Sequence, residues 1–191
     1  MDLSQYLQGD AQAKAAFVAA LGKAFTEIGF VGVVNHGIPK ELVNKFYAES
    51  QAFFAMSSEE KKQYEKAEYA GQRGYTSFGK EHAKQSNVGD LKEFFQIGQI
   101  VPAESDLVGQ YPANVDVKER PEFLATGIEL YRQFEKSGAA LLEAIAIFLG
   151  LDKDYFVAHI TGGNSILRAI HYPPITSEPK SAIRAEEHED I

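Results

Sequence analysis

The feature that most constrains this chain is a change in the spacing of its apolar residues near Ser165. Before that point the long regular segments repeat their apolar residues at helical intervals. After it, apolar and polar residues alternate, as they do in a β-strand with two different faces. A chain that places its main helices first and its strands last is predicted to be an α+β protein.

Three long helices are predicted ahead of this change. Between Asp10 and Ile28 the large apolar residues form one stripe, and Asp10 can cap the start of that helix. Gly29 suits the left-handed residue that ends a helix. Pro39 suits the first turn of a second helix, which keeps its large apolar residues near one face. The third helix follows Pro121 and ends at Gly150, with a short helix expected soon after it.

Four segments have the composition of strands. Residues 30–34 are short, β-branched and bounded by turn residues, which predicts a buried strand, and residues 90–97 alternate well enough for another. Residues 165–172 and 183–191 alternate most clearly. Two strands at the end of a chain cannot make a closed sheet. We therefore expect that part of the fold is missing from this sequence.

Composition and charge exclude several classes of function. Nineteen basic against 27 acidic side chains give a net charge of −8, which disfavours nucleic acid and anionic membranes as partners. The Lys61-Lys62 pair lies among glutamates, after a capping box of Ser57 and Glu60, and is interpreted as a solvated helix face. The absence of cysteine excludes disulfides and thiolate chemistry and fits a reducing compartment. With no signal peptide and no apolar stretch long enough to span a bilayer, the expected location is cytoplasmic.

The triplet His188-Glu189-Asp190 is the most suggestive feature for chemistry. Residues two apart on a strand point the same way, so His188 and Asp190 would present an imidazole and a carboxylate side by side. That pair suits Fe(II), which is commonly held by two histidines and one carboxylate with positions left open. The alternative is a solvated acidic tail, since glutamates surround the triplet.

Arg168 and Tyr172 are the second candidate group. Both share one face of the predicted strand with Ile166 and Ile170, so the charge of Arg168 is expected to be partly buried. A buried guanidinium needs an anion, which either a substrate or the protein itself can supply. An internal salt bridge, or a side chain that reaches solvent from an edge strand, is the alternative to a binding role.

Taken in order, the motifs resemble the isopenicillin N synthase-like family of 2-oxoglutarate- and Fe(II)-dependent oxygenases. The resemblance covers nearly the whole chain. It is carried by residues 25–38 (FTEIGFVGVVNHGI), Phe53-Phe54 with the following SSEEK, Arg73-Gly74-Tyr75, residues 90–95 (DLKEFF), residues 168–174 (RAIHYPP) and residues 184–190 (RAEEHED).

This resemblance implies a fold, a cofactor and site residues. Residues 1–164 would form an N-terminal helical and mixed region, and residues 165–191 the first strands of a double-stranded β-helix, or jelly roll. Such enzymes use Fe(II), 2-oxoglutarate and dioxygen to oxidise a small organic substrate. By position, His188 and Asp190 match the first two iron ligands, Tyr172 matches a residue that contacts the oxoacid or substrate, and Arg168 matches a position near the substrate.

The family's second histidine ligand and its Arg-x-Ser site for 2-oxoglutarate have no counterpart before Ile191. The chain is therefore expected to be an N-terminal portion with its C-terminal part absent, inactive by itself. Two alternatives remain open: an iron oxidase that does not use 2-oxoglutarate, and a truncated, non-catalytic homologue that acts as a binding module. Neither the identity of the substrate nor the oligomeric state follows from the sequence.

Overall fold

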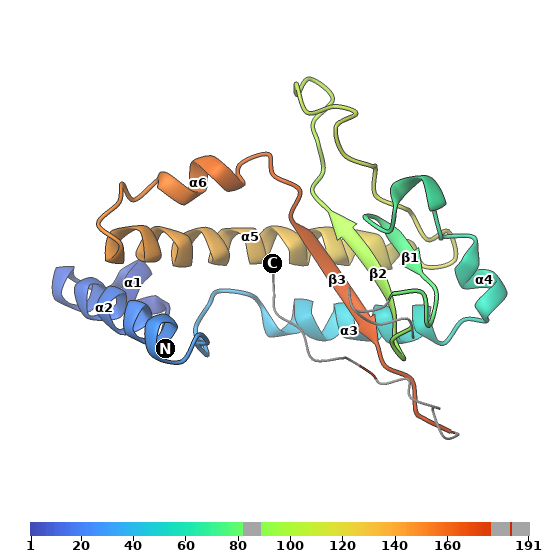
Figure 1. Ribbon diagram of the computed structural model, residues 1–191, viewed down its shortest axis with the longest axis horizontal. Coiled ribbons are helices and arrows are strands. Elements are labelled where there is room, and N and C mark those ends of the chain that lie inside the picture. Colours follow the sequence, from blue (N-terminus) through green and yellow to red (C-terminus); the bar gives the residue numbers. More distant parts are fainter. Residues whose placement is uncertain (82–88, 177–183, 185–191) are drawn as a thin grey trace. The chain divides into compact units, whose positions relative to one another are not determined.

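The computed structural model describes residues 1–81, 89–176 and 184 (Figure 1). The elements are α1 (Ser4–Gln8), α2 (Ala11–Glu27), α3 (Lys40–Phe54), α4 (Ser58–Lys62), the 3-10 helix η1 (Ala67–Tyr69), β1 (Gly74–Thr76), β2 (Glu93–Gly98), α5 (Pro121–Phe148), α6 (Tyr155–Ile160) and β3 (Ile166–His171). They divide into two compact units. Unit 1 comprises Met1–Val43 and Glu129–Asn164, and unit 2 comprises Asn44–Ile128 and Ser165–Ile191.

Unit 1 is built around α2, which begins and ends as predicted. The Asp10 carboxylate accepts a hydrogen bond from the backbone N–H of Ala13 at 2.8 Å, and Gly29 has a φ of 83°. The core consists of Leu3, Tyr6, Phe17, Leu21 and Ala144. Gly22 lets the ring of Phe148 pack closely where α2 meets the end of α5, because a Cβ atom there would lie 2.1 Å from that ring as it stands.

The predicted buried strand at residues 30–34 is wrong. The segment forms only an isolated parallel bridge between Asp2 and Val34. Val31 and Val33 pack against the unit 1 core, whereas the side chain of Phe30 is exposed. A β-branched, apolar segment needs a neighbouring strand to become a sheet. Among the described residues, the N-terminal residues beside it pair with it at that one bridge only.

Unit 2 contains a three-stranded antiparallel sheet in the order β1-β2-β3. The strands predicted within residues 90–97 and 165–172 are confirmed as β2 and β3. In the register, Phe95 lies opposite Tyr75 on one side and Ala169 on the other, so these three side chains share a face. The run at residues 183–191 lies outside the described residues, apart from Arg184.

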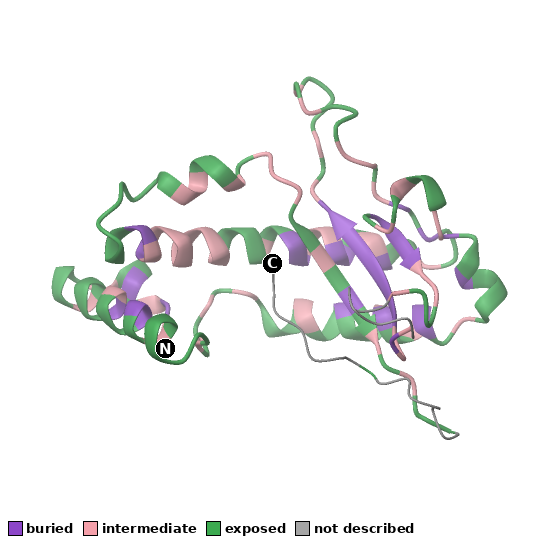
Figure 2. Ribbon diagram, in the orientation of Figure 1, coloured by how far each residue is buried: buried purple, intermediate pink, exposed green. Residues whose placement is uncertain are grey.

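An aromatic cluster holds this sheet face against two helices. The ring centroid of Phe95 lies 5.1 Å from that of Phe53 on α3 and 4.9 Å from that of Phe123 on α5, and all three side chains are fully buried. Figure 2 shows the consequence: β2 is buried along its whole length, whereas β3 alternates between exposed and covered residues. We call this covered side of the sheet the core face.

Helices and a small antiparallel sheet confirm the α+β class in its coarse form. The capping box is confirmed as well, since the Ser57 hydroxyl and the Glu60 carboxylate each bond to the backbone N–H of the other residue. The division at residues 164 and 165 into a helical region and the start of a jelly roll stays a prediction. Within the described part of the chain, no helix is both long and apolar enough to cross a membrane.

Candidate functional site

The predicted metal ligands His188 and Asp190 lie outside the described residues. Within residues 1–81, 89–176 and 184, no three His, Cys, Asp or Glu side chains come close enough to hold a metal ion. The remaining described histidines therefore supply no alternative centre in that part of the chain. The assignment of His188 and Asp190 stays a prediction that rests on donor chemistry and on the resemblance of residues 184–190 to the family's iron-binding strand.

Arg168 occupies the side of the sheet opposite the core face, as its alternation with Ala169 predicts. The Arg168 side chain is partly buried, as expected. Phe94 and Gln96 cover it, rather than Ile166 and Ile170, which are themselves exposed. The aromatic cluster covers Ala169 on the core face. Alternation separates the two faces of a strand, but it does not say which one the helices cover.

Three contacts within unit 2 hold the Arg168 side chain. Its Nε donates to Oε1 of Gln96 at 2.8 Å, and the guanidinium carbon lies 4.3 Å from the centroid of the Phe94 ring. Its Nη1 lies 3.2 and 3.3 Å from the two carboxylate oxygens of Glu81. The anion that a partly buried guanidinium needs is therefore the Glu81 carboxylate, which the protein itself supplies. The pair is nevertheless accessible, with 35% of the Arg168 side chain and 33% of the Glu81 side chain exposed.

Arg168 lines a pocket of about 510 Å³ on this side of the sheet. Strands β1 and β2, the loop before β1 and the segment after β1 supply further lining residues, among them Gly71, Gln72, Thr76, Lys80, Glu81, Phe94 and Gln96. The guanidinium and its three contacts therefore belong to one concave surface of unit 2. We call this the Arg168 pocket.

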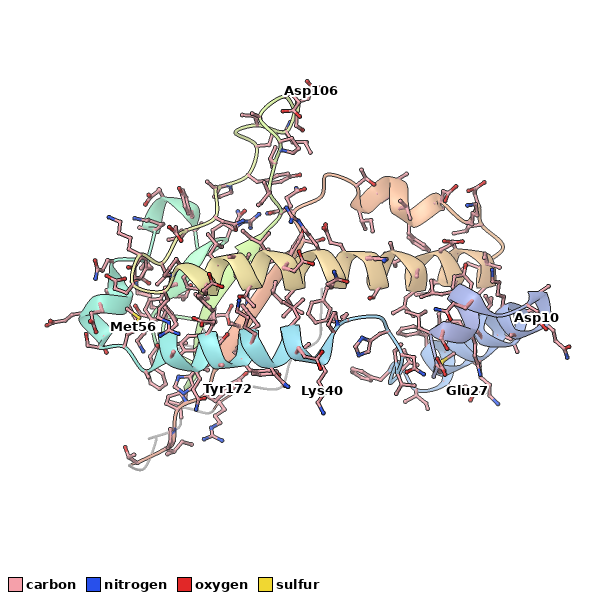
Figure 3. The ribbon with its side chains drawn as sticks, turned by 180° about the vertical axis from the view of Figure 1, so that it is seen from behind. Asp10, Glu27, Lys40, Met56, Asp106 and Tyr172 are labelled. Carbon is pink, nitrogen blue, oxygen red and sulfur yellow. The ribbon has the colours of Figure 1, made fainter. Side chains whose placement is uncertain are left out.

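Tyr172 lies one residue beyond the end of β3, where Figure 3 labels it. Its side chain is more than a third exposed, and it is not among the residues that line the Arg168 pocket. The structure therefore brings Arg168, but not Tyr172, into a pocket. The role of both residues in binding stays a prediction.

Sequence reasoning missed a buried polar network on the core face of the sheet. Glu93 at the start of β2 accepts from Lys61 Nζ at 3.0 and 2.8 Å through its two oxygens, and from the Tyr75 hydroxyl. Nδ1 of His171 lies 2.8 Å from Oε1 of Glu93, and the His171 ring stacks on Phe54 at 5.2 Å. We call Lys61, Tyr75, Glu93 and His171 the Glu93 network; His171 lies at its edge, with 37% of its side chain exposed.

Lys61 corrects the interpretation of the Lys61-Lys62 pair as a solvated face. Lys62 is exposed, but Lys61 is only 6% exposed and turns inward to Glu93. The available signal was Glu93 itself, which alternates with Phe95 and Ile97 and so falls on the apolar face of its strand. A carboxylate there needs a buried cation. Nothing local identifies Lys61 as that cation.

The electrostatics of the Glu93 network favour an ionised carboxylate. Burial raises the pKa of Glu93, but the hydrogen bonds from Lys61, Tyr75 and His171 outweigh it, so the pKa lies below its ordinary value. Burial and the hydrogen bond to Glu93 both raise the pKa of Tyr75, which keeps that hydroxyl protonated as a donor. Opposite charges on Glu93 and Lys61 therefore neutralise one another inside the unit.

Comparison with known proteins places this geometry in context. The family model described as "non-haem dioxygenase in morphine synthesis N-terminal" matches residues 1–119. Proline hydroxylase buaE of Petromyces alliaceus is 30% identical, with 100% of this chain and 60% of that protein covered. The 2-oxoglutarate-dependent dioxygenase ecdK of Aspergillus rugulosus is 31% identical, with 92% of this chain and 56% of that protein covered.

Solved structures agree with these relatives. A 2OG-Fe(II) oxygenase family protein from Caulobacter crescentus has a TM-score of 0.82 and 34% identity, covering 94% of this chain and 57% of its own. A full-length Neurospora crassa protein in complex with alpha-KG has a TM-score of 0.81 and 27% identity, covering 100% and 60%. The chain thus spans between half and two thirds of the length of each of these four proteins.

Proposed function

The chain belongs to the non-haem dioxygenase family whose N-terminal model matches residues 1–119, and on that premise we propose that the protein oxidises a small organic molecule with dioxygen, Fe(II) and 2-oxoglutarate. The family match is the observation that carries the proposal. The names of the relatives support it, because buaE is a proline hydroxylase and ecdK a 2-oxoglutarate-dependent dioxygenase. The similar Neurospora crassa protein has been solved with alpha-KG alone and with alpha-KG and thymine, which supports a small-molecule substrate.

Iron is proposed to bind to His188 and Asp190. A neutral imidazole and a carboxylate are donors that suit Fe(II), and the absence of cysteine leaves no thiolate to compete for it. When bound, Fe(II) together with 2-oxoglutarate would supply the activation of dioxygen. The part that falls to described residues is binding and orientation of the organic molecules.

Arg168 is proposed to orient the substrate, and Tyr172 to contact the substrate or 2-oxoglutarate. Support for Arg168 comes from its exposed guanidinium edge in the pocket and from the contacts that hold it in place. Tyr172 is exposed just beyond the end of β3, with a hydroxyl that can donate a hydrogen bond.

For the remaining features we propose that residues 165–191 form the first strands of a double-stranded β-helix like that of the relatives. We also propose that the protein works in the cytoplasm, without a nucleic-acid or membrane partner. The lack of cysteine supports the cytoplasmic location, and the net charge of −8 supports the absence of those partners.

Oxygen consumption tests the function. On the longest form of the protein that its gene encodes, we expect uptake of dioxygen and formation of succinate only when both Fe(II) and 2-oxoglutarate are present. His188→Ala and Asp190→Ala should abolish both. His159→Ala is the matched control, because His159 is an exposed residue of α6 in unit 1. Full activity of the His188→Ala variant would refute the iron assignment.

A further inference from the structure

We infer that the Arg168 pocket takes up a small molecule bearing a carboxylate, which replaces the Glu81 carboxylate on Arg168. This deepens the proposed function, on which it rests for the identification of that molecule as a substrate. The guanidinium of Arg168 has two contacts that are fixed and one, with Glu81, that a ligand can replace.

Gln96 and Phe94 form the fixed side. Gln96 is 4% exposed and lies directly opposite Arg168 in the sheet register. Its Nε2 donates to the backbone carbonyl of Gly71, which leaves Oε1 to accept from Nε of Arg168. A reversed carboxamide would place one donor against another. Together with the Phe94 ring, this contact fixes the plane of the guanidinium and directs its Nη edge into the pocket.

Glu81 forms the replaceable side. Its two oxygens share the single Nη1 of Arg168 at 3.2 and 3.3 Å, whereas a strong pair between an arginine and a carboxylate is shorter, at about 2.7–2.9 Å, and often uses two parallel N–H groups. Both side chains are about a third exposed, so water screens the pair. A ligand carboxylate at the Nη edge can therefore form a better contact than the resident one.

Glu81 still has a cationic partner after it leaves Arg168. Its shorter contact is with Lys92, whose Nζ lies 2.7 Å from Oε2 of Glu81 and 2.8 Å from Asp90. Burial lowers the pKa of Lys92, but the hydrogen bonds to Asp90 and Glu81 outweigh it and raise the pKa, so Lys92 stays charged. Glu81 thus keeps a cation when Arg168 turns to a ligand.

The charge and size of the pocket fit such a ligand. Three cations, Lys66, Lys80 and Arg168, line it against two carboxylates, Glu65 and Glu81. The surplus positive charge favours one further carboxylate. A volume of about 510 Å³ falls within the range of about 300–1,000 Å³ that is usual for small-molecule sites.

Benzoate and its uncharged isostere benzamide are the probes that test this inference, titrated into the 191-residue chain and followed by NMR. We expect benzoate to bind more tightly than benzamide and to shift the Nε–Hε signal of Arg168. Arg168→Gln should weaken benzoate at least about tenfold, the loss expected when hydrogen bonds to a charged group are removed. Benzamide should change little.

Glu81→Gln provides the sharper test, because it removes the resident competitor. Benzoate should then bind about fivefold more tightly, which corresponds to about 1 kcal/mol, the upper end for an exposed ion pair. Glu122→Gln makes the same change in net charge at an exposed residue of unit 2 that does not line the pocket. It should leave benzoate affinity unchanged.

Three outcomes would overturn the inference: benzamide binding as tightly as benzoate, no benzoate binding to the wild type or to Glu81→Gln, or an equal effect of Glu81→Gln and Glu122→Gln. None of these measurements uses oxygen consumption. A protein that binds benzoate through Arg168 but never consumes dioxygen would refute the proposed function alone.

Discussion

Replacing Glu93 by glutamine is the most informative change that can be made to the buried part of unit 2. Glutamine has nearly the same shape as glutamate, so the packing around Phe95 is preserved and the effect is mainly electrostatic. The neutral side chain keeps one acceptor oxygen and gains an N–H₂ group. That group would face the ammonium of Lys61 or the hydroxyl of Tyr75, both of which are donors to Glu93.

The size of the effect follows from how deeply the charges are buried. The Lys61 and Glu93 side chains are 7% and 6% exposed, so water cannot replace the lost carboxylate. Lys61 would retain its contact with the Phe54 carbonyl at 3.0 Å, which carries no compensating charge. Removing one partner of a buried ion pair costs about 3–5 kcal/mol because the other charge is left uncompensated. At about 2–4 °C per kcal/mol for a chain of this size, the melting temperature should fall by roughly 10 °C.

Urea and thermal unfolding, followed by circular dichroism, measure this loss. Glu122→Gln is again the matched control, since its partner Lys45 is exposed and the variant should unfold close to the wild type. The double variant Lys61→Met/Glu93→Gln removes both charges and should be more stable than the sum of the two single effects implies. If Glu93→Gln unfolds at the same urea concentration as Glu122→Gln, the argument from buried charge is refuted.

Four further predictions concern stability, titration and metal binding. Arg168→Gln should lower the melting temperature far less than Glu93→Gln, because its ion pair is about one third exposed; a fall of roughly 10 °C in thermal unfolding would contradict this. The folded pKa of Glu93 lies below its ordinary value, so the stability that Glu93 contributes is full above the ordinary pKa and is lost as the pH falls through the folded pKa. Urea midpoints measured across the acid range should show this loss in the wild type and not in Glu93→Gln. Burial, followed by the hydrogen bond to Glu143, raises the pKa of Tyr6 from 10.0 to about 12. The stability that Tyr6 contributes is therefore full below pH 10.0 and is lost as the pH rises through about 12. The difference between ultraviolet titrations of the wild type and Tyr6→Phe measures this pKa. The 191-residue chain should bind Mn(II), a surrogate for Fe(II), only weakly in calorimetry, because two ligands leave most of the coordination sphere to water; tight binding that survives His188→Ala would show that the ligand assignment is wrong.

The parts of the fold that were predicted correctly depend on neighbouring residues in the chain. Asp10 caps α2 through the backbone only three residues away, and Ser57 and Glu60 satisfy one another over the same distance. Local hydrogen bonds of this kind can be recognised from spacing alone. The strand at residues 30–34 failed for the converse reason, because a strand needs a partner that no local pattern supplies.

The site depended on contacts that are remote in sequence. Lys61 and Glu93 are 32 residues apart, and Glu81 and Arg168 are 87 residues apart. The sequence indicated that Arg168 needs an anion, but the identity of that anion followed only from the sheet and the segment after β1. Glu93 carried a comparable signal, a carboxylate on an apolar face, and its partner was equally impossible to locate in advance.

The two faces of β3 explain why these polar groups have different consequences. Ala169 points to the core face, where the aromatic cluster covers it, and Glu93 on the neighbouring strand β2 is only 6% exposed there, so its charge has to be matched inside the protein. Arg168 points to the pocket, where solvent reaches its ion pair and a ligand can compete for it. A carboxylate that meets a cation on the core face therefore contributes to the stability of unit 2. The Glu81 carboxylate, which meets Arg168 on the other face, is free to be exchanged, and exchange of this kind is what a binding site requires.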